Sequence, residues 1–166
     1  MPKMASTDIT CYFDADHASD LVTRRSVTGI LLFLGSTPVR WYSKRQNTVE
    51  SSTYGSEFVA ARISKDMVME FRYKLRMLGV PVDKPSLLLG DNLSVITSCT
   101  LPSSSLKKKH NAIAYHGVRE AVAAGVILLA HVKSKDNLAD ILTKSVNGTS
   151  HRLLVGPLLF QRPVSS

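Results

Sequence analysis

The sequence predicts an α/β domain with a five-stranded mixed sheet flanked by helices, in the order βββαβαβα. Short apolar runs bounded by glycine, proline and serine are typical of strands. One longer segment repeats its apolar residues every four positions, which indicates an amphipathic helix. The first three strands follow one another through short loops, so we expect them to form an antiparallel meander within a sheet of mixed pairing.

The first half of the chain contains the three consecutive strands, expected over 10–14, 26–34 and 39–43. A long helix follows candidate caps at 51–53, and Gly79 is expected to end it. Its predicted buried stripe consists of Val59, Ile63, Met67, Phe71 and Leu75.

The second half predicts, in order, a strand over 86–90, a short helix through Val95 and Ile96, a loop over 100–105, a helix over 109–124, a strand over 126–132 and a helix over 137–144. Asp136 is the expected N-cap of the last helix. Residues 1–146 should form one domain. Glycine and proline interrupt 147–166, so these residues are expected to be a weakly determined tail.

Composition limits the classes of protein to which the chain can belong. A length of 166 residues with 44% hydrophobic content suits one globular domain. No apolar run approaches the length of a membrane span, and the N-terminus lacks the apolar centre of a signal peptide. We therefore expect an intracellular protein, cytoplasmic or nuclear and not secreted, without a membrane partner. Cys11 and Cys99 should be reduced, since neither has metal-ligand spacing.

The chain is basic, with 21 Lys and Arg against 13 Asp and Glu and a net charge of +8. Such a surface favours polyanions, although a basic protein can also be merely soluble. Clustered acids would make the nucleic-acid interpretation more specific. A nucleic acid would be held by the basic surface and cut at the acids.

Four carboxylates lie where predicted apolar segments end or within them: Asp14, Glu57, Asp91 and Asp140. Strands normally avoid aspartate, so acids at these places suggest a task other than folding. If the segments converge, the negative charges would destabilise one another unless divalent cations neutralised them. This is the composition of a two-metal nuclease site.

The element order and several short motifs resemble the RNase H domain of copia-type retrotransposon polyproteins. The matching pieces are 13–16 (Phe-Asp-Ala-Asp), 24–29 (Arg-Arg-Ser-Val-Thr-Gly), 41–46 (Trp-Tyr-Ser-Lys-Arg-Gln), 51–57, 91–92, 109–110, 115–120 (Tyr-His-Gly-Val-Arg-Glu) and 139–144 (Ala-Asp-Ile-Leu-Thr-Lys). They occur in order across 9–146. The resemblance implies the ribonuclease H-like fold, with three antiparallel strands and then two parallel ones. It also implies an endonuclease that cleaves the RNA strand of RNA:DNA hybrids.

The resemblance also implies that Asp14, Glu57, Asp91 and Asp140 are both the catalytic residues and the metal ligands. Hard oxygen ligands suit Mg²⁺ or Mn²⁺. Two ions about 3.5 to 4 Å apart would activate a water, clamp the scissile phosphate and stabilise the leaving 3′-oxygen. Asp16 is an alternative first ligand, because strand alternation places it on the same side as Asp14. We prefer Asp14, since it follows the apolar run directly.

Two of the acids also have an ordinary structural explanation. Asp91 could cap the helix that begins near Leu93, and Glu57 could be a first-turn acid favoured by the helix dipole. Asp140 is harder to explain in this way.

Many RNase H enzymes place a histidine in the loop before the last acid, but 133–137 contains none. Copia-type domains commonly lack it too, and we interpret His131 as a strand residue.

A second set of residues is expected to bind nucleic acid. It consists of Lys44, Lys107, Lys108, Lys109, His110 and Arg119. Lysines would contact phosphates without reading bases, and RNA would be selected through its 2′-hydroxyls and A-like duplex shape. The 107–110 run could equally be a solvated charge cluster. Trp41 and Tyr42 could stack on bases, although a pair in a strand more often has one core and one surface residue.

Two other functions compete with the hybrid endonuclease. One is a catalytically weak or inactive transposon-derived remnant that only binds nucleic acid or a neighbouring polyprotein segment. The other is a transposase-like or junction-cutting nuclease of the same fold, which the copia-type motifs disfavour. The chain lacks the Tyr-x-Asp-Asp pattern of reverse transcriptase. We therefore expect a domain of a larger polyprotein, with its reverse transcriptase portion as partner, or a stand-alone remnant.

Overall fold

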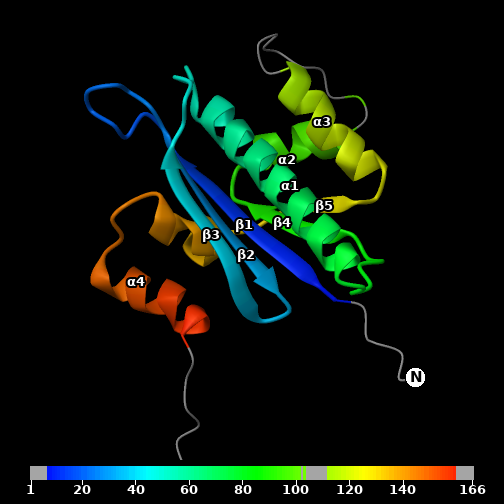
Figure 1. The fold of residues 1–166 in the computed structure, drawn as a ribbon. Helices are drawn as coiled ribbons and strands as arrows, with labels where there is room; N and C mark the ends of the chain where they lie inside the picture. The colour runs from blue at the N-terminus through cyan, green and yellow to red at the C-terminus, as the bar shows by residue number, and fades with distance from the viewer. Residues whose placement is uncertain (1–6, 102, 104–111, 160–166) are drawn as a thin grey trace, which may run out of the picture.

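The computed structural model describes residues 7–101, 103 and 112–159, and the strands among them form one mixed sheet in the order β3-β2-β1-β4-β5 (Figure 1). The strands are β1 (Ile9–Asp16), β2 (Val27–Leu34), β3 (Thr37–Arg45), β4 (Ser86–Gly90) and β5 (Ile127–His131). Antiparallel pairs join β1 to β2 and β2 to β3, and parallel pairs join β1 to β4 and β4 to β5. The predicted pairing is confirmed, with β1 at the centre.

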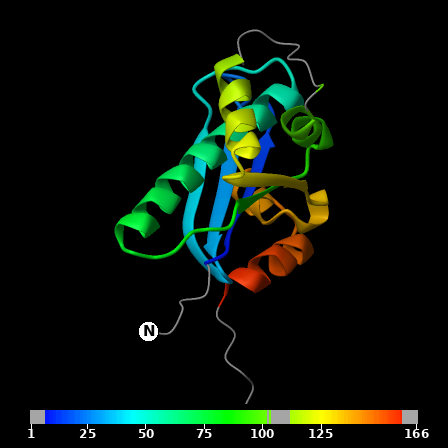
Figure 2. The same ribbon diagram turned by 90° about the vertical axis from the view of Figure 1, so that its right-hand side faces the viewer.

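Helices cover the two faces of this sheet unequally (Figures 1 and 2). The long helix α1 (Thr53–Met77) crosses one face, with α2 (Leu93–Thr100) and α3 (Ala112–Ala123) beside β4 and β5. The short 3₁₀ helix η3 (Leu138–Leu142) packs on β1 and β2, on the face opposite α1, and α4 (Gly148–Val155) packs on η3. Two further 3₁₀ turns, η2 (Ser134–Asp136) and η4 (Gly156–Leu158), flank these two helices.

The core lies between the sheet and α1. Alternate residues of β1 face it, so Cys11 and Phe13 are fully buried and join Phe58 and Val68 of α1 in one apolar cluster. Strand alternation turns Tyr12 and Asp14 the other way, toward η3. The two free cysteines are buried, and burial raises the pKa of each thiol to about 12.

Helix α1 buries a face that is rotated from the predicted stripe. Met67 and Leu75 are buried as expected, but Val59 is only half-buried. The fully buried line instead includes the polar Ser64 and Arg72. The Ser64 hydroxyl donates to the carbonyl of Ala60, and the Arg72 guanidinium donates to Val82 O, Lys84 O and Ser86 Oγ. These hydrogen bonds satisfy the polar atoms of both side chains and so offset the free-energy cost of burying them.

The last predicted helix has a different form and a different cap. Instead of an α-helix over 137–144, η3 is a 3₁₀ helix over Leu138–Leu142, and its N-cap is Asn137, whose side chain accepts the N–H of Ala139. The prediction of Asp136 as cap was wrong. Asp136 belongs to the preceding turn η2, and Asn137 is fully buried where it can cap η3. Helix α4 follows in the segment expected to be a weakly determined tail, and the domain boundary at 146 stays a prediction.

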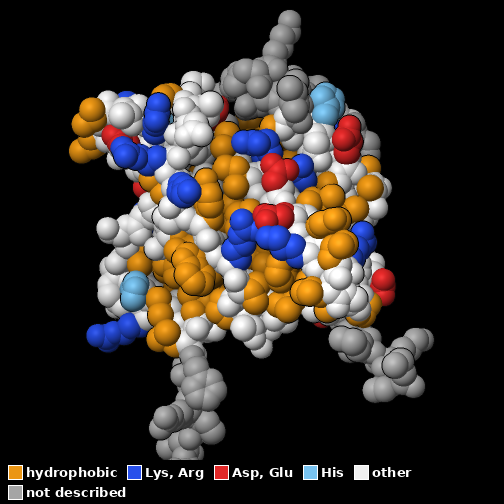
Figure 3. Space-filling model, in the orientation of Figure 1, with side chains coloured by type: hydrophobic (Ala, Val, Ile, Leu, Met, Phe, Trp, Pro, Cys, Tyr) orange, Lys and Arg blue, Asp and Glu red, His pale blue; other side chains and the backbone are white. Residues whose placement is uncertain are grey.

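The surface over α1 mixes charges of both signs (Figure 3). Arg40 and Lys74 pair with Glu70, each at 2.6 Å, and Arg62 lies 3.6 Å from Asp66. Paired side chains at this exposure contribute little to stability, but they offset much of the basic charge on this face. No helix among the described residues has the length and apolar character needed to cross a membrane.

Gly29 sets how closely η3 approaches the sheet. It lies in β2 directly opposite Asp14 of β1. A Cβ on Gly29 would lie 2.6 Å from Thr143 Cγ2 and 2.7 Å from the backbone oxygen of Ala139. Neither atom belongs to a flexible side-chain end. A side chain at position 29 would therefore push η3 away from the strand that carries Asp14.

We expect Gly29→Ala to destabilise the domain by about 1 to 3 kcal/mol, the usual range for overpacking a filled site. Chemical denaturation of the metal-free protein measures this change. Gly148→Ala at the start of α4 is the matched control, because an added Cβ there meets no heavy atom within 4 Å. Equal stability of the two variants would contradict the role assigned to Gly29.

Candidate active site

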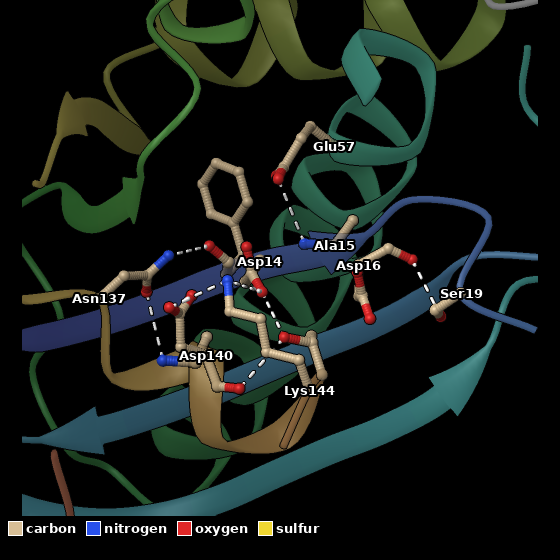
Figure 4. Close-up of polar contacts among 11 residues, drawn as sticks. Asp14, Ala15, Asp16, Ser19, Glu57, Asn137, Asp140 and Lys144 are labelled. Carbon is tan, nitrogen blue, oxygen red and sulfur yellow. Dashed lines mark hydrogen bonds and ion pairs between the residues drawn. The ribbon is translucent and has the colours of Figure 1, made fainter. Parts of the chain in front are cut away.

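Asp14 sits near the end of the central strand, where β1 passes over η3. Its side chain is buried, with 3% relative exposure, and one carboxylate oxygen accepts a hydrogen bond from the Thr143 hydroxyl (Figure 4). The same hydroxyl lies 3.2 Å from the carbonyl oxygen of Asp140. Asn137 adds a second tie, since its amide donates to the carbonyl of Phe13 over 3.0 Å. These contacts hold the carboxylate of Asp14 at a defined place.

Glu57 comes to the same place from α1. Its Oε1 accepts the backbone N–H of Ala15 over 3.3 Å, so the helix is joined directly to the end of β1 (Figure 4). Its Oε2 is buried and has no hydrogen-bond partner among the described residues. The first turn of α1 contains no acid, so the explanation of Glu57 as a first-turn dipole acid was wrong.

Asp91 completes a group of three carboxylates. It directly follows β4, and one oxygen each of Asp14, Glu57 and Asp91 lie within 4.8 Å of one another. The explanation of Asp91 as a helix cap was wrong, because Asn92 caps α2 by accepting the N–H of Val95. Asp91 is half-buried and its side chain lines the pocket that holds the other two acids.

Asp140 lies beside this group but is paired differently. Its Oδ2 is 3.0 Å from the Lys144 ammonium, which is also 4.0 Å from Asp14 Oδ2 (Figure 4). Its Oδ1 is buried without a hydrogen-bond partner among the described residues. The structure therefore brings all four predicted acids to one end of β1, with three grouped closely and the fourth joined through a lysine.

Burial makes ionisation of this cluster costly. Burial raises the pKa of Glu57 to about 9, and the charges of Asp14 and Asp91 add to that increase. Burial also raises the pKa of Asp14 to about 6, although the Thr143 hydrogen bond lowers it. Carboxylates kept buried against their own repulsion are typical of functional sites rather than of folding.

The residues fit a divalent cation. Two oxygens on opposite sides of one Mg²⁺ lie about 4 Å apart, so the three grouped oxygens are near the spacing of one coordination shell. The unpartnered Oε2 of Glu57 is a further observation in favour, because a bound cation would satisfy it. Carboxylate oxygens alone suit Mg²⁺ or Mn²⁺ better than softer metals. Among the described residues, Asp14, Glu57 and Asp91 could therefore hold a metal ion.

Asp16 and two histidines lie near the acid cluster but outside the close group. Asp16 ends β1 and lines the pocket, but the close group contains Asp14 and not Asp16. His131 is the last residue of β5, as interpreted from the sequence, and its ring nitrogen lies 3.1 Å from the carbonyl oxygen of Asp91. His17, which the sequence did not single out, also lines the pocket.

Two of the six residues predicted to bind nucleic acid, Lys44 and Arg119, are among the described residues. Lys107, Lys108, Lys109 and His110 lie outside the described residues. Lys44 is exposed on β3 with its ammonium 5.7 Å from the ring centre of Tyr42. Arg119 donates to Ser98 O and Leu101 O and lies over the ring of Tyr115, so its charge also supports the C-terminal end of α2. Contact of these residues with nucleic acid stays a prediction.

The sequence singled out the four acids that the structure brings together, but not the residues that hold them in place. Asn137, Thr143 and Gly29 act through contacts between segments more than 100 residues apart. Gly29 and Thr143 lie in two of the matching motifs, and an asparagine before a short apolar run is a common N-cap pattern, but none of these signals indicates the contacts. The aromatic pair on β3 divides as expected: Trp41 is exposed, and Tyr42 packs against the core.

No protein-family model matches the chain. Curated relatives do match it: the retrovirus-related Pol polyprotein from transposon RE1 of Arabidopsis thaliana is 31% identical over 150 residues, 90% of this chain. The corresponding polyprotein from transposon TNT 1-94 of Nicotiana tabacum is 33% identical over 136 residues, 81% of this chain. The chain spans about a tenth, 10%, of the length of each relative.

Solved structures share the fold at low sequence identity. LC11-RNase H1, solved in complex with an RNA/DNA hybrid, has a TM-score of 0.64 at 14% identity and covers 82% of this chain and 94% of its own. RNase H1 from Halobacterium salinarum gives 0.61 at 16% identity over the same shares. The foamy viral protease-reverse transcriptase with an RNA/DNA hybrid gives 0.55 at 15% identity, covering 86% of this chain and 21% of its own. The chain is thus an RNase H-like domain homologous to part of the Pol polyproteins of copia-type retrotransposons.

Proposed function

We propose that the domain is a metal-dependent ribonuclease H, an endonuclease that cleaves the RNA strand of RNA:DNA hybrids. The observation that carries this proposal is the group formed by Asp14, Glu57 and Asp91, whose oxygens lie within 4.8 Å of one another in a buried setting. Such a group has no evident use in folding, because burial and mutual repulsion disfavour its charged form. A divalent cation would make that form favourable.

The side chains divide the work of holding cations and substrate. Asp14, Glu57 and Asp91 would hold one Mg²⁺ or Mn²⁺, and Asp14 with Asp140 would complete a second position when substrate is bound. The bound ions would supply Lewis-acid activation of a water and neutralise charge on the phosphate. The protein's own contribution is rigid placement, through Thr143 on Asp14 and Ala15 on Glu57. Hydrolysis would leave 5′-phosphate and 3′-hydroxyl ends.

The expected substrate rests on homology and on charge. Two of the structural neighbours were solved in complex with RNA/DNA hybrids, which supports the same class of duplex here. A net charge of +8 favours binding to phosphates. The RNA strand would be recognised through its 2′-hydroxyls and the A-like duplex shape.

The expected partner is the reverse transcriptase portion of the same polyprotein. Curated relatives are Pol polyproteins of which this chain spans 10%, and one neighbour joins the fold to a protease-reverse transcriptase. A cytoplasmic or nuclear location follows from that role and stays a prediction.

The first experiment is cleavage of a labelled RNA:DNA hybrid with and without Mg²⁺ or Mn²⁺, beside single-stranded RNA and double-stranded DNA. Cooperative folding without metal-dependent cleavage of hybrid would reject the proposal.

Asp91→Asn should separate catalysis from stability. Removal of a metal ligand should lower hybrid cleavage by at least about 100-fold, the upper effect of changing outer-shell partners. The metal-free melting temperature should be unchanged or higher, because the charge of Asp91 raises the pKa of both Glu57 and Asp14. Both quantities should be measured on one preparation.

The exposed Asp136→Asn is the matched control for this substitution, since Asp136 lies in η2 outside the acid cluster. It should retain cleavage. An Asp91→Asn variant that cleaves hybrid as well as the control does would remove Asp91 from the site.

The raised pKa values predict an unusual dependence of metal-free stability on pH. The folded state binds protons at Glu57 and Asp14 more tightly than the unfolded state, with pKa values of about 9 and about 6. Their contribution to the free energy of unfolding is complete below the pKa values of the unfolded state, near 4. It is lost as pH rises through about 6, for Asp14, and then through about 9, for Glu57. Melting temperature in EDTA should therefore fall from pH 5 to pH 9.

Divalent cations should reverse this trend, because they favour the ionised carboxylates. Stabilisation by Mg²⁺ should increase between pH 6 and pH 8. Glu57→Gln is the control, since it keeps an Oε1 acceptor for Ala15 but cannot ionise. A pH profile in EDTA that is identical for Glu57→Gln and the wild type would contradict the assignment.

Hybrid binding should weaken steeply with salt, because it rests on phosphate neutralisation. Replacing Lys107, Lys108 and Lys109 with Ala should reduce the slope of log Kd against log salt by up to about 2 to 3, close to one unit per lost contact. Binding can be measured in EDTA to prevent cleavage, with circular dichroism to verify folding. Lys84→Ala, which removes a lysine paired with Asp8, is the control. An unchanged slope would indicate that 107–109 is a solvated charge cluster that does not contact the hybrid.

A further inference from the structure

Lys144 is the only lysine or arginine among the described residues that forms an ion pair with one of the four acids. Its ammonium lies 3.0 Å from Asp140 Oδ2 and 4.0 Å from Asp14 Oδ2, and it shares the pocket with Glu57 and Asp91 (Figure 4). Its side chain is 41% exposed, so the stem runs from solvent inward to the acids. The ammonium therefore occupies space between two carboxylates that a cation would otherwise share.

The backbone fixes Lys144 in this place. Its N–H donates to the carbonyl of Asp140 over 3.2 Å, and the neighbouring Thr143 hydroxyl donates to the Asp14 carboxylate. The lysine thus follows directly on a segment that is tied to β1. Burial lowers the pKa of Lys144, but the charges of Asp14 and Asp140 raise it further, and the net value lies above the ordinary one.

We propose that Lys144 is a built-in counter-ion of the acid cluster, which holds the Asp140 side in the free protein and leaves one divalent-cation site at Asp14, Glu57 and Asp91. This inference rests on the proposed function for the identity of that cation. The geometry divides the cluster in the same way, since the close group of ligand oxygens excludes Asp140.

The charge of Lys144 limits how many divalent cations the cluster can hold. Once metal binding has displaced the proton of Glu57, four ionised carboxylates and one ammonium carry a net charge of minus three, so a first divalent cation leaves minus one and a second would leave plus one. The second cation is then favourable only once a phosphate adds negative charge. Lys144 would thereby link occupancy of the second position to the arrival of nucleic acid.

The test is a titration of the full chain with Mn²⁺ in the absence of nucleic acid. Binding is measured by calorimetry or from the paramagnetic resonance signal of free Mn²⁺. The wild type should bind one Mn²⁺ per chain. Lys144→Met should bind two, with the first dissociation constant lower by on the order of tenfold, because a repelling charge has been removed. Its melting temperature in EDTA should fall by about 2 to 4 °C, since the acids lose their counter-ion.

Lys84→Met is the matched control, because its ammonium also lies 3.0 Å from a carboxylate, that of Asp8, but away from the site. It should leave Mn²⁺ stoichiometry unchanged. If Lys144→Met does not fold, Lys144→Met combined with Asp140→Asn removes both charges of the pair and should restore the melting temperature while binding one Mn²⁺ more tightly than the wild type.

The outcomes separate this inference from the proposed function. A wild type that binds one Mn²⁺ and a Lys144→Met variant with the same stoichiometry and affinity would overturn the counter-ion role while leaving the metal site intact. Two Mn²⁺ ions on the free wild type would overturn it as well. A wild type that binds none would reject the metal site itself and, with it, the division of the cluster.

Discussion

The structure depends on how closely the short 3₁₀ helix η3 approaches the first pair of strands. Gly29 leaves the space, Asn137 ties the entry of η3 to the carbonyl of Phe13, and Thr143 ties its exit to Asp14. Without this approach, Asp140 and Lys144 would not reach β1. Two of these three contacts are hydrogen bonds made by fully buried or nearly buried groups, whose loss would leave unpaired polar atoms inside the protein. The same contacts therefore both complete the fold and assemble the site.

Close packing at a second glycine, Gly90, positions the other side of the site. Gly90 ends β4 immediately before Asp91, and a Cβ there would lie 2.3 Å from the Phe13 ring. The core thus reaches to the residue that precedes one acid, and Ala15, which adjoins Asp14, binds Glu57. The acids gather because close packing at Gly29 and Gly90 brings together the elements that carry them. Repulsion among the carboxylates works against this packing and is offset by tertiary contacts elsewhere.

The sequence predicted the order of the elements and the mixed strand pairing, because alternation and turn residues are local signals, and it marked out the four acids that the structure brings together. It was wrong where burial depends on hydrogen bonds formed across the fold. Ser64 and Arg72 are polar, so the period of α1 placed its buried face elsewhere, although both side chains are satisfied inside. Asp136 and Asn137 are both good cap residues, and only the contact of Asn137 with Phe13 decides between them. Lys144 belonged to a matching motif, but its position between two acids required the structure.

The electrostatics of the free site follow from this packing. A cluster of buried acids can be kept folded by protonation, by a bound cation or by a fixed positive side chain, and this chain has the means for all three. Glu57, with a pKa raised to about 9, is suited to protonation, and Lys144 supplies the fixed charge beside Asp140. If the cluster binds a metal ion as proposed, that ion would displace the proton of Glu57 but need not displace Lys144. The pH would then act on metal binding through Glu57, and the fixed charge of Lys144 would act on the other half of the site.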